Sequence, residues 1–267
     1  MVKGLYTAYT GMVEEQRRLD VLTNNLANAN TTGYKKEGAT NASFAEKLAL
    51  RIKDTAHPNL AAGMGYIKMG VKVGETYTNY EQGGFRVTDE PSDLAIGGEG
   101  FFAIEYTDKQ GNTSIKYTRD GAFTVDNEGY FRTSDGDYLL NMGAALAGRT
   151  GDNAHVRVDP MLDYQVDSQG NIWQEGVNIG QVGVVDIDNY DYILKYGENL
   201  YDIQEGGNVV ATNDMLLEQG ALETSNVNIV DEMVSMITIQ RAFEAGQKMI
   251  QAEDETIEMA VSQVGRV

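Results

Sequence analysis

The apolar residues at the two ends of the chain recur every seven positions. The repeated positions are Leu5, Met12, Leu19 and Leu26 near the N-terminus, and Ile229, Met236, Phe243, Ile250, Ile257 and Val264 near the C-terminus. Residues 1–32 contain no proline. Apolar residues on one side of a helix recur with this spacing, and a strict seven-residue period favours helices that wind around a partner. The pattern therefore predicts one helix at each end of the chain.

Helix start and stop signals bound these two elements. The first helix should end between Asn28 and Gly33, where the glycine can adopt a left-handed C-terminal cap. Asn228 is a suitable N-cap for the second helix, and Asp231 suits the positive start of a helix. A helix from residue 229 to residue 264 would be roughly 50 Å long.

Neither helix can bury its apolar stripe alone. The residues four positions after the first five C-terminal stripe positions are Met233, Gln240, Gln247, Asp254 and Val261. Three of these are polar or charged, which argues against a self-contained two-stranded coiled coil. We expect the terminal helices to pair along their apolar columns, with amide-rich flanks facing other subunits. The alternative is a helical hairpin packed on the chain's own body.

This pairing predicts an assembly interface that combines the apolar columns with the amide-rich flanks. Its expected residues are Leu5, Met12, Leu19, Leu26, Asn24, Asn25, Asn28, Ile229, Met236, Phe243, Ile250, Ile257, Gln240 and Arg241.

The middle of the chain has a different pattern. Residues 34–74 are glycine-punctuated with little sustained periodicity, and we interpret them as a linker or extended arm. From residue 75 to residue 215, short β-type runs alternate with turn signals such as Asn127-Glu128-Gly129. No helical crossovers separate these strands, so the sheet should be mainly antiparallel. The predicted fold is α+β: axial helices in segments 1–33 and 216–267 form a coiled-coil-like domain, and 75–215 forms an outer β domain.

Composition narrows the possible partners. The net charge of −19 argues against nucleic acid, because phosphate contacts need clustered Lys and Arg. It also argues against an anionic membrane surface, and no run approaches the ~20 apolar residues of a membrane span. There is no cysteine, which excludes disulfides and thiolate metal sites. We expect no cleaved signal peptide, because no continuous apolar core follows Lys3.

Signals for chemistry are weak. His57 and His155 lie in unrelated contexts, and no nucleophile elbow or phosphate loop is present. We expect no enzyme activity, cofactor or metal. Two alternatives remain open at this point. One is a secreted carbohydrate-binding or adhesive module with a helical oligomerisation stalk, using Trp173. The other is a hydrolase that uses Asp126 or Asp135.

Four ordered motifs resemble the flagellar rod and hook axial proteins. They are LTNNLANANTTGYK at residues 22–35, DLAIGGEGFFAI at 93–104, YTRDGAFTV at 117–125 and GALETSNV at 220–227, the last followed by QRAFE at 240–244. The family often has a tyrosine where Phe243 stands, and residues 141–160 and 188–210 match no family motif. Because the motifs cover both ends and the body, the resemblance is specific.

The resemblance implies that the terminal helices form the inner shell of a tubular axial filament that transmits torque from motor to hook. It implies as partners other copies of this chain, other rod and hook axial proteins, and the flagellar type III export apparatus. It also implies a place in the periplasm-spanning rod of the basal body. The chain has no room for the extra outer domain of hook proteins, which favours a rod protein in a distal or proximal position.

Overall fold

The structure is a computed structural model that describes residues 2–51, 62–197, 199–212 and 215–264. The chain divides into two compact units. Unit 1 comprises residues 1–27, 36–79 and 227–267, and unit 2 comprises residues 28–35 and 80–226. Both ends of the chain therefore belong to unit 1, and the chain passes between the units four times.

Unit 1 contains both predicted terminal helices, α1 (Val2–Ala27) and α3 (Ile229–Val264). The Asn228 side chain caps α3 by accepting a hydrogen bond from the amide of Val230 at 3.1 Å. α1 ends at Ala27, before the predicted cap at Gly33. Gly33 does have a left-handed conformation, with φ +66°. Its amide, however, donates to the carbonyl of Glu223 inside unit 2 rather than closing the helix.

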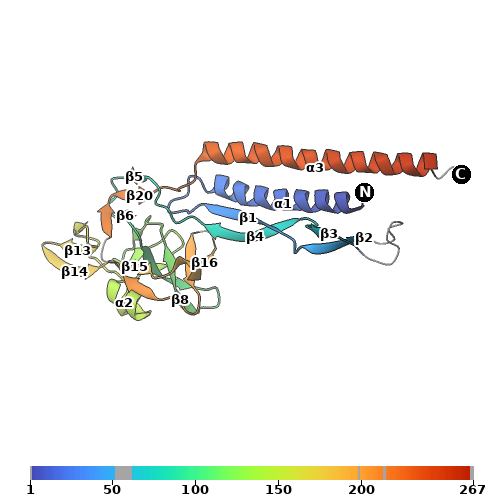
Figure 1. Ribbon diagram of the computed structural model, residues 1–267. Helices are drawn as coiled ribbons and strands as arrows, with labels where there is room; N and C mark the ends of the chain where they lie inside the picture. The colour runs from blue at the N-terminus through green and yellow to red at the C-terminus, as the bar shows by residue number, and fades with distance from the viewer. Residues whose placement is uncertain (1, 52–61, 198, 213–214, 265–267) are drawn as a thin grey trace. The chain divides into compact units, whose positions relative to one another are not determined.

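The two helices lie side by side and run antiparallel (Figure 1). Three contacts show the direction. Near the end of α1, Asn25 Nδ2 donates to Glu232 at the start of α3. Further along, a Cβ built on Gly246 would lie 2.7 Å from Cγ of Met12, and one built on Gly4 would meet the Glu253 carboxylate. Residue numbers therefore fall along α1 as they rise along α3.

Two antiparallel strand pairs complete unit 1 on the side of α1 away from α3 (Figure 1). β1 (Glu37–Ser43) pairs with β4 (Val71–Thr78), and β2 (Lys47–Arg51) pairs with β3 (Ala62–Ile67). The linker interpretation of residues 34–74 missed these strands. The side chains of β1 and β4 are exposed or half-buried and none is fully buried, so these strands lack the regular alternation of a strand with one buried face. His57 lies outside the described residues.

Unit 2 contains the antiparallel β structure predicted for the centre of the chain. Its largest sheet has the strand order β16-β17-β8-β7-β11-β10-β9, with β15 pairing to both β7 and β18. The strands of this sheet are β7 (Phe101–Thr107), β8 (Thr113–Thr118), β9 (Thr124–Val125), β10 (Phe131–Arg132), β11 (Tyr138–Leu139), β15 (Val184–Ile187), β16 (Ile193–Tyr196), β17 (Leu200–Ile203) and β18 (Val209–Ala211).

Smaller sheets and short helices complete unit 2. The remaining strands are β12 (Tyr164–Val166), β13 (Asn171–Gln174) and β14 (Val177–Gln181) in one sheet, β19 (Leu216–Gln219) with β6 (Leu94–Gly97), and β20 (Ala221–Glu223) with β5 (Phe85–Val87). The helices are α2 (Met142–Ala147) and two 3-10 turns, η1 (Asp152–Ala154) and η2 (Tyr190–Tyr192). Every strand pairing in the described part of the chain is antiparallel, which confirms the predicted fold class.

Strand β7 lies at the centre of the unit 2 core. Phe102 and Ile104 point into one buried apolar cluster, and Phe101 and Ala103 point into a second. Successive side chains of a strand face opposite sides of the sheet, so β7 is covered on both faces. Unit 2 therefore has a complete hydrophobic core of its own.

None of the described helices combines the length and apolar content needed to cross a bilayer. Within the described part of the chain, no group of three or more His, Asp or Glu side chains is arranged to hold a metal ion.

Candidate assembly interface

The predicted apolar columns meet along the seam between α1 and α3. The column residues that lie half-buried are Leu5, Met12, Leu19 and Leu26 of α1 and Met236, Phe243, Ile250 and Ile257 of α3. Ile229, at the first turn of α3, is exposed instead. The described side chains of the two columns therefore share one seam, but none of them is fully buried.

The α3 side of the seam has a second column that the sequence analysis did not identify. Its residues Glu232, Ile239, Gly246 and Glu253 lie against α1 and follow the apolar column by three positions. All the residues four positions after the column are exposed, from Met233 to Val261. The new column explains the tight seam: Gly246 lets Met12 approach closely, and Ile239 is buried. The polar residues four positions after the apolar column therefore lie outside the seam.

The asparagines near the end of α1 lie both inside unit 1 and on its surface. Asn25 is 0% exposed. Its amide nitrogen donates to the Glu37 carbonyl at 2.8 Å, and its oxygen accepts from the Glu37 amide at 2.9 Å. Asn25 therefore ties the end of α1 to the start of β1, and this buried position does not fit its predicted role as a subunit-facing flank. Asn24 is exposed, and Asn28 is half-buried in unit 2.

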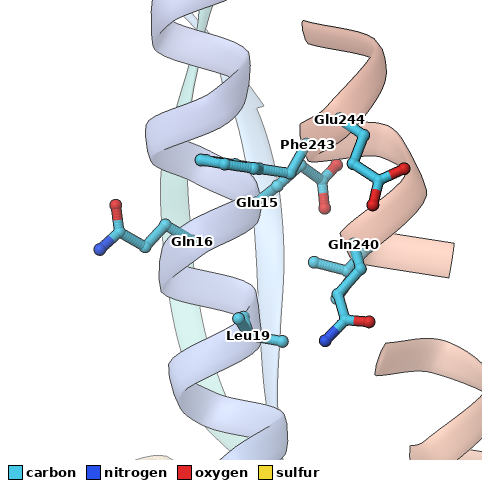
Figure 2. A pocket seen from close by; sticks show the side chains of 7 residues that line it. Glu15, Gln16, Leu19, Gln240, Phe243 and Glu244 are labelled. Carbon is cyan, nitrogen blue, oxygen red and sulfur yellow. The ribbon is translucent and has the colours of Figure 1, made fainter. Parts of the chain in front are cut away.

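A groove of about 370 Å³ lies over the middle of the seam (Figure 2). Its apolar surface comes from Leu19, Ile239 and Phe243, whose ring is directed from α3 toward α1. Its polar rim consists of Glu15, Gln16, Gln240 and Glu244. Glu15 forms an ion pair with Arg18 at 3.1 Å. The predicted residues Phe243 and Gln240 thus belong to one concave surface that is open to a partner, and Arg241 lies exposed beside it.

Glu14 is an unusual buried group on the opposite side of α1. It is 3% exposed, and neither carboxylate oxygen has a hydrogen-bond partner in the described part of the chain. Burial raises the pKa of Glu14, and the neighbouring Glu15 raises it further, while Arg18 and Arg17 lower it. A charged carboxylate without partners is costly to bury, so Glu14 weakens the packing of α1 in an isolated chain.

Unit 2 contains a buried ion cluster that sequence reasoning did not predict. Lys35 Nζ lies 2.6 Å from Glu223 Oε1, and Arg119 NH1 lies 3.3 Å from Glu223 Oε2. Lys35 also donates to the Glu81 carbonyl, and Arg119 to the Gly98 carbonyl at 2.9 Å. Burial lowers the pKa of Lys35, while the Glu223 charge and hydrogen bond favour its charged form.

The cluster joins all four sequence motifs in one place. Lys35, Gly98, Arg119 and Glu223 each come from a different motif. The available signal for the cluster was a charged residue, Glu223, at the end of a short apolar β segment. A single sequence, however, cannot show that Lys35, Arg119 and Glu223 meet in the fold. The N-terminal motif, residues 22–35, therefore includes the end of α1 and a following segment, residues 28–35, that belongs to unit 2.

Comparison with known proteins gives matches along most of the chain. Residues 5–35 match the family described as "Flagella basal body rod protein", and residues 95–187 match "Flagellar hook protein FlgE/F/G D1 domain". Residues 218–263 match "Flagellar basal body rod FlgEFG protein C-terminal". The three matched segments correspond to α1, the central part of unit 2, and a segment that includes most of α3.

Whole-chain relatives agree with these matches. The chain is 32% identical to the flagellar basal-body rod protein FlgF of Caulobacter vibrioides, over 100% of both chains. It is 33% identical to the flagellar basal-body rod protein FlgG of Bacillus subtilis, over 98% of this chain and 99% of the relative. It is also 30% identical to the hook-basal body complex protein FlhO of Bacillus subtilis over the full length of both. The carbohydrate-binding alternative gains no support from these relatives. The chain belongs to the flagellar basal-body rod protein family.

Proposed function

We propose that this chain is a structural subunit of the bacterial flagellar basal-body rod and that it assembles through unit 1. The observation that carries the proposal is the incomplete burial of the α1–α3 seam. Its apolar columns are shared between two helices that run side by side, yet the column side chains stay half-buried and the groove over Phe243 stays open. Neighbouring subunits would cover this surface and complete the burial.

The mechanism is mechanical and needs no chemistry. Subunits held side by side along their α1–α3 pairs form an axial array in which torque passes from one copy to the next. Such an array needs two different faces for each contact, because a two-fold contact would close after two copies. The partners in this proposal are other copies of the chain and neighbouring rod and hook axial proteins. Export through the flagellar type III apparatus and a position in the periplasm-spanning rod belong to the same proposal.

The acidic unit 2 fits an outer position in this assembly. Nine basic and 26 acidic side chains give residues 28–35 and 80–226 a net charge of −17. The rest of the chain has 12 basic and 14 acidic side chains, and its net charge is therefore only −2. Closely packed copies repel each other through like charges, so the nearly neutral unit 1 is the better packing surface.

Replacing Phe243 with Asp tests the proposal. The substitution places a charge in the half-buried seam, where it has no cationic partner. We expect cells that make only this variant to lose swimming and to lack the chain in purified basal bodies. The single tryptophan, Trp173, lies in unit 2, so its fluorescence should show that unit 2 stays folded.

Gln247→Asp is the matched control. Gln247 lies one turn further along α3 and is exposed, so the same new charge remains in water. This variant should assemble and swim. Normal swimming with Phe243→Asp would overturn the role assigned to the seam.

A further inference from the structure

The groove over Phe243 has the chemistry of a receptor for an apolar ridge that ends in a cation. Its surface is formed by Leu19, Ile239 and Phe243, and its two charged lining residues are both carboxylates. Glu15 already has a partner in Arg18. Glu244 is exposed and has no ion-pair partner among the described residues. An occupant that fills the groove would therefore gain most by bringing one positive charge to Glu244.

The outer face of α3 carries such a ridge. Val230, Val234 and Ile237 are 67%, 56% and 49% exposed, and Arg241 follows one turn later. Their spacing of four, three and four places them in one row along the helix. The row lies opposite Glu232 and Ile239, so it points away from α1. Arg241 is exposed and has no ion-pair partner in the described part of the chain.

We propose that the groove of one subunit receives the Val230–Val234–Ile237–Arg241 ridge of a second copy of this chain, with Arg241 beside Glu244. The proposal rests on the proposed function, and it names which surfaces meet. Charge complementarity selects this occupant. Other exposed apolar side chains of the helices lie near a cation, such as Tyr6 and Tyr9 near Lys3, and Met249 next to Lys248. Neither of these two sets offers three apolar side chains on successive turns.

The geometry of the two surfaces suits an open array. With 3.6 residues per turn, the ridge is centred about 120° around α3 from the groove residues Ile239, Gln240, Phe243 and Glu244. The contact therefore joins different faces of two copies and leaves a free ridge at one end and a free groove at the other. Each added copy is also turned relative to the last, so the copies curve around an axis.

A charge exchange between two separate chains tests the pairing. Arg241→Glu reverses the charge of the ridge only, and Glu244→Arg reverses the charge of the groove only. Cells whose own copy is deleted would express either variant or both, and the chain recovered in purified basal bodies would be measured beside swimming. We expect each variant alone to reduce the recovered chain at least about tenfold. Co-expression should restore it to within about twofold of the wild type, because alternating copies pair every ridge with a complementary groove.

Exchange between separate chains removes any effect of Arg241 and Glu244 lying on the same helix. The matched control is Lys248→Glu, which makes the same charge change on the same exposed face beyond the ridge and should leave recovery unchanged. Normal recovery of either single variant, or no rescue on co-expression, would overturn the pairing while leaving rod membership intact. Normal swimming by the deleted cells would instead overturn the proposed function, and the pairing with it.

Cross-linking provides an independent measurement, because the natural chain has no cysteine. Ile237→Cys and Gln16→Cys place one thiol on the ridge and one on the groove rim. When both singly substituted chains are co-expressed in swimming cells, a short bismaleimide should join one of each. Cells that swim but give only like-with-like products, or none, would contradict the proposal.

Discussion

Unit 1 and unit 2 bury their apolar residues in opposite ways. In unit 2, the strands around β7 enclose two buried clusters in which Phe101, Phe102, Leu139 and Val184 are inaccessible to solvent. In the described part of α1 and α3, Ile239 is the one apolar side chain that is fully buried. The apolar column residues of the seam around it are only half-buried. Charge follows the same division, with −17 on unit 2 and −2 on unit 1.

The difference shows which unit buries enough apolar surface to stay folded in an isolated chain. Hydrophobic burial is the main favourable term in folding, so unit 2 is stabilised within one chain. Long helices with a half-open seam gain less and lose much conformational entropy when they become ordered. We therefore expect unit 1 to depend on surface that neighbouring copies would cover. The following substitutions should act on one unit and leave the other unchanged.

Glu223→Gln should have the largest effect, and it should be confined to unit 2. It leaves Lys35 and Arg119 buried with an incomplete partner, and breaking a buried ion pair costs about 3–5 kcal/mol. Denaturant unfolding followed by Trp173 fluorescence measures this loss directly. Glu218→Gln is the control, because Glu218 is exposed on β19. An unchanged midpoint for Glu223→Gln would show that the cluster does not stabilise unit 2.

Gly33→Ala should destabilise the docking of residues 28–35 in unit 2 by about 3 kcal/mol. Gly33 has φ +66°, and an added Cβ would lie 2.5 Å from the carbonyl carbon of Arg119. The loss has two causes, the positive φ of Gly33 and the close approach to Arg119, and the control Gly111→Ala separates them. Gly111 also has a positive φ, but no atom lies near its added Cβ. The control should lose only about 1 kcal/mol in the same unfolding assay. Equal losses would mean that the close approach to Arg119 is unimportant.

Glu14→Gln should have the smallest effect, and only on unit 1. The pKa of Glu14 is raised in the folded chain, so the folded state holds its proton more tightly than the unfolded state does. The resulting stability is complete below the unfolded pKa, near 4.5, and is lost as pH rises through the folded pKa.

At pH 7 the Glu14→Gln variant should therefore be more stable by about 1 kcal/mol, and at pH 4 it should match the parent. Thermal melting of the helical circular dichroism signal measures both values. Glu15→Gln, which removes a partly exposed carboxylate paired with Arg18, should give no such gain at pH 7. A gain for Glu14→Gln that is equal at both pH values would contradict the assignment of the effect to a buried charge.

The sequence predicted the elements with strong local signals. The seven-residue column and the Asn228 cap predicted α3, and the Gly-containing turn at residues 127–129 does separate two paired strands of unit 2. The strands of residues 37–78 were missed, because the side chains of β1 and β4 are exposed or half-buried without a regular alternation. The end of α1 was placed too late, because the positive φ of Gly33 serves a contact within unit 2.

The candidate interface was predicted less completely than the fold. The apolar columns were identified, but the second α3 column, three residues along, was missed because only the residues four positions along were considered. Helix neighbours lie at both spacings, and only the direction in which α1 crosses the surface of α3 decides between them. Asn25 was assigned to the subunit surface, although it is buried against Glu37 at the start of β1, a strand that was not predicted. The Lys35–Arg119–Glu223 cluster depends on contacts between distant segments, which no local pattern records.

Hydrogen exchange tests most directly whether unit 1 gains its order from assembly. Amide exchange would be followed in the soluble full-length chain and in the chain within isolated basal bodies. In the soluble chain we expect α1 and α3 to exchange much faster than β7 and β8, because their seam is half-open. In the basal bodies both helices should become as protected as the core strands. Helices protected in the soluble chain as strongly as β7 would contradict the claim that unit 1 depends on neighbouring subunits.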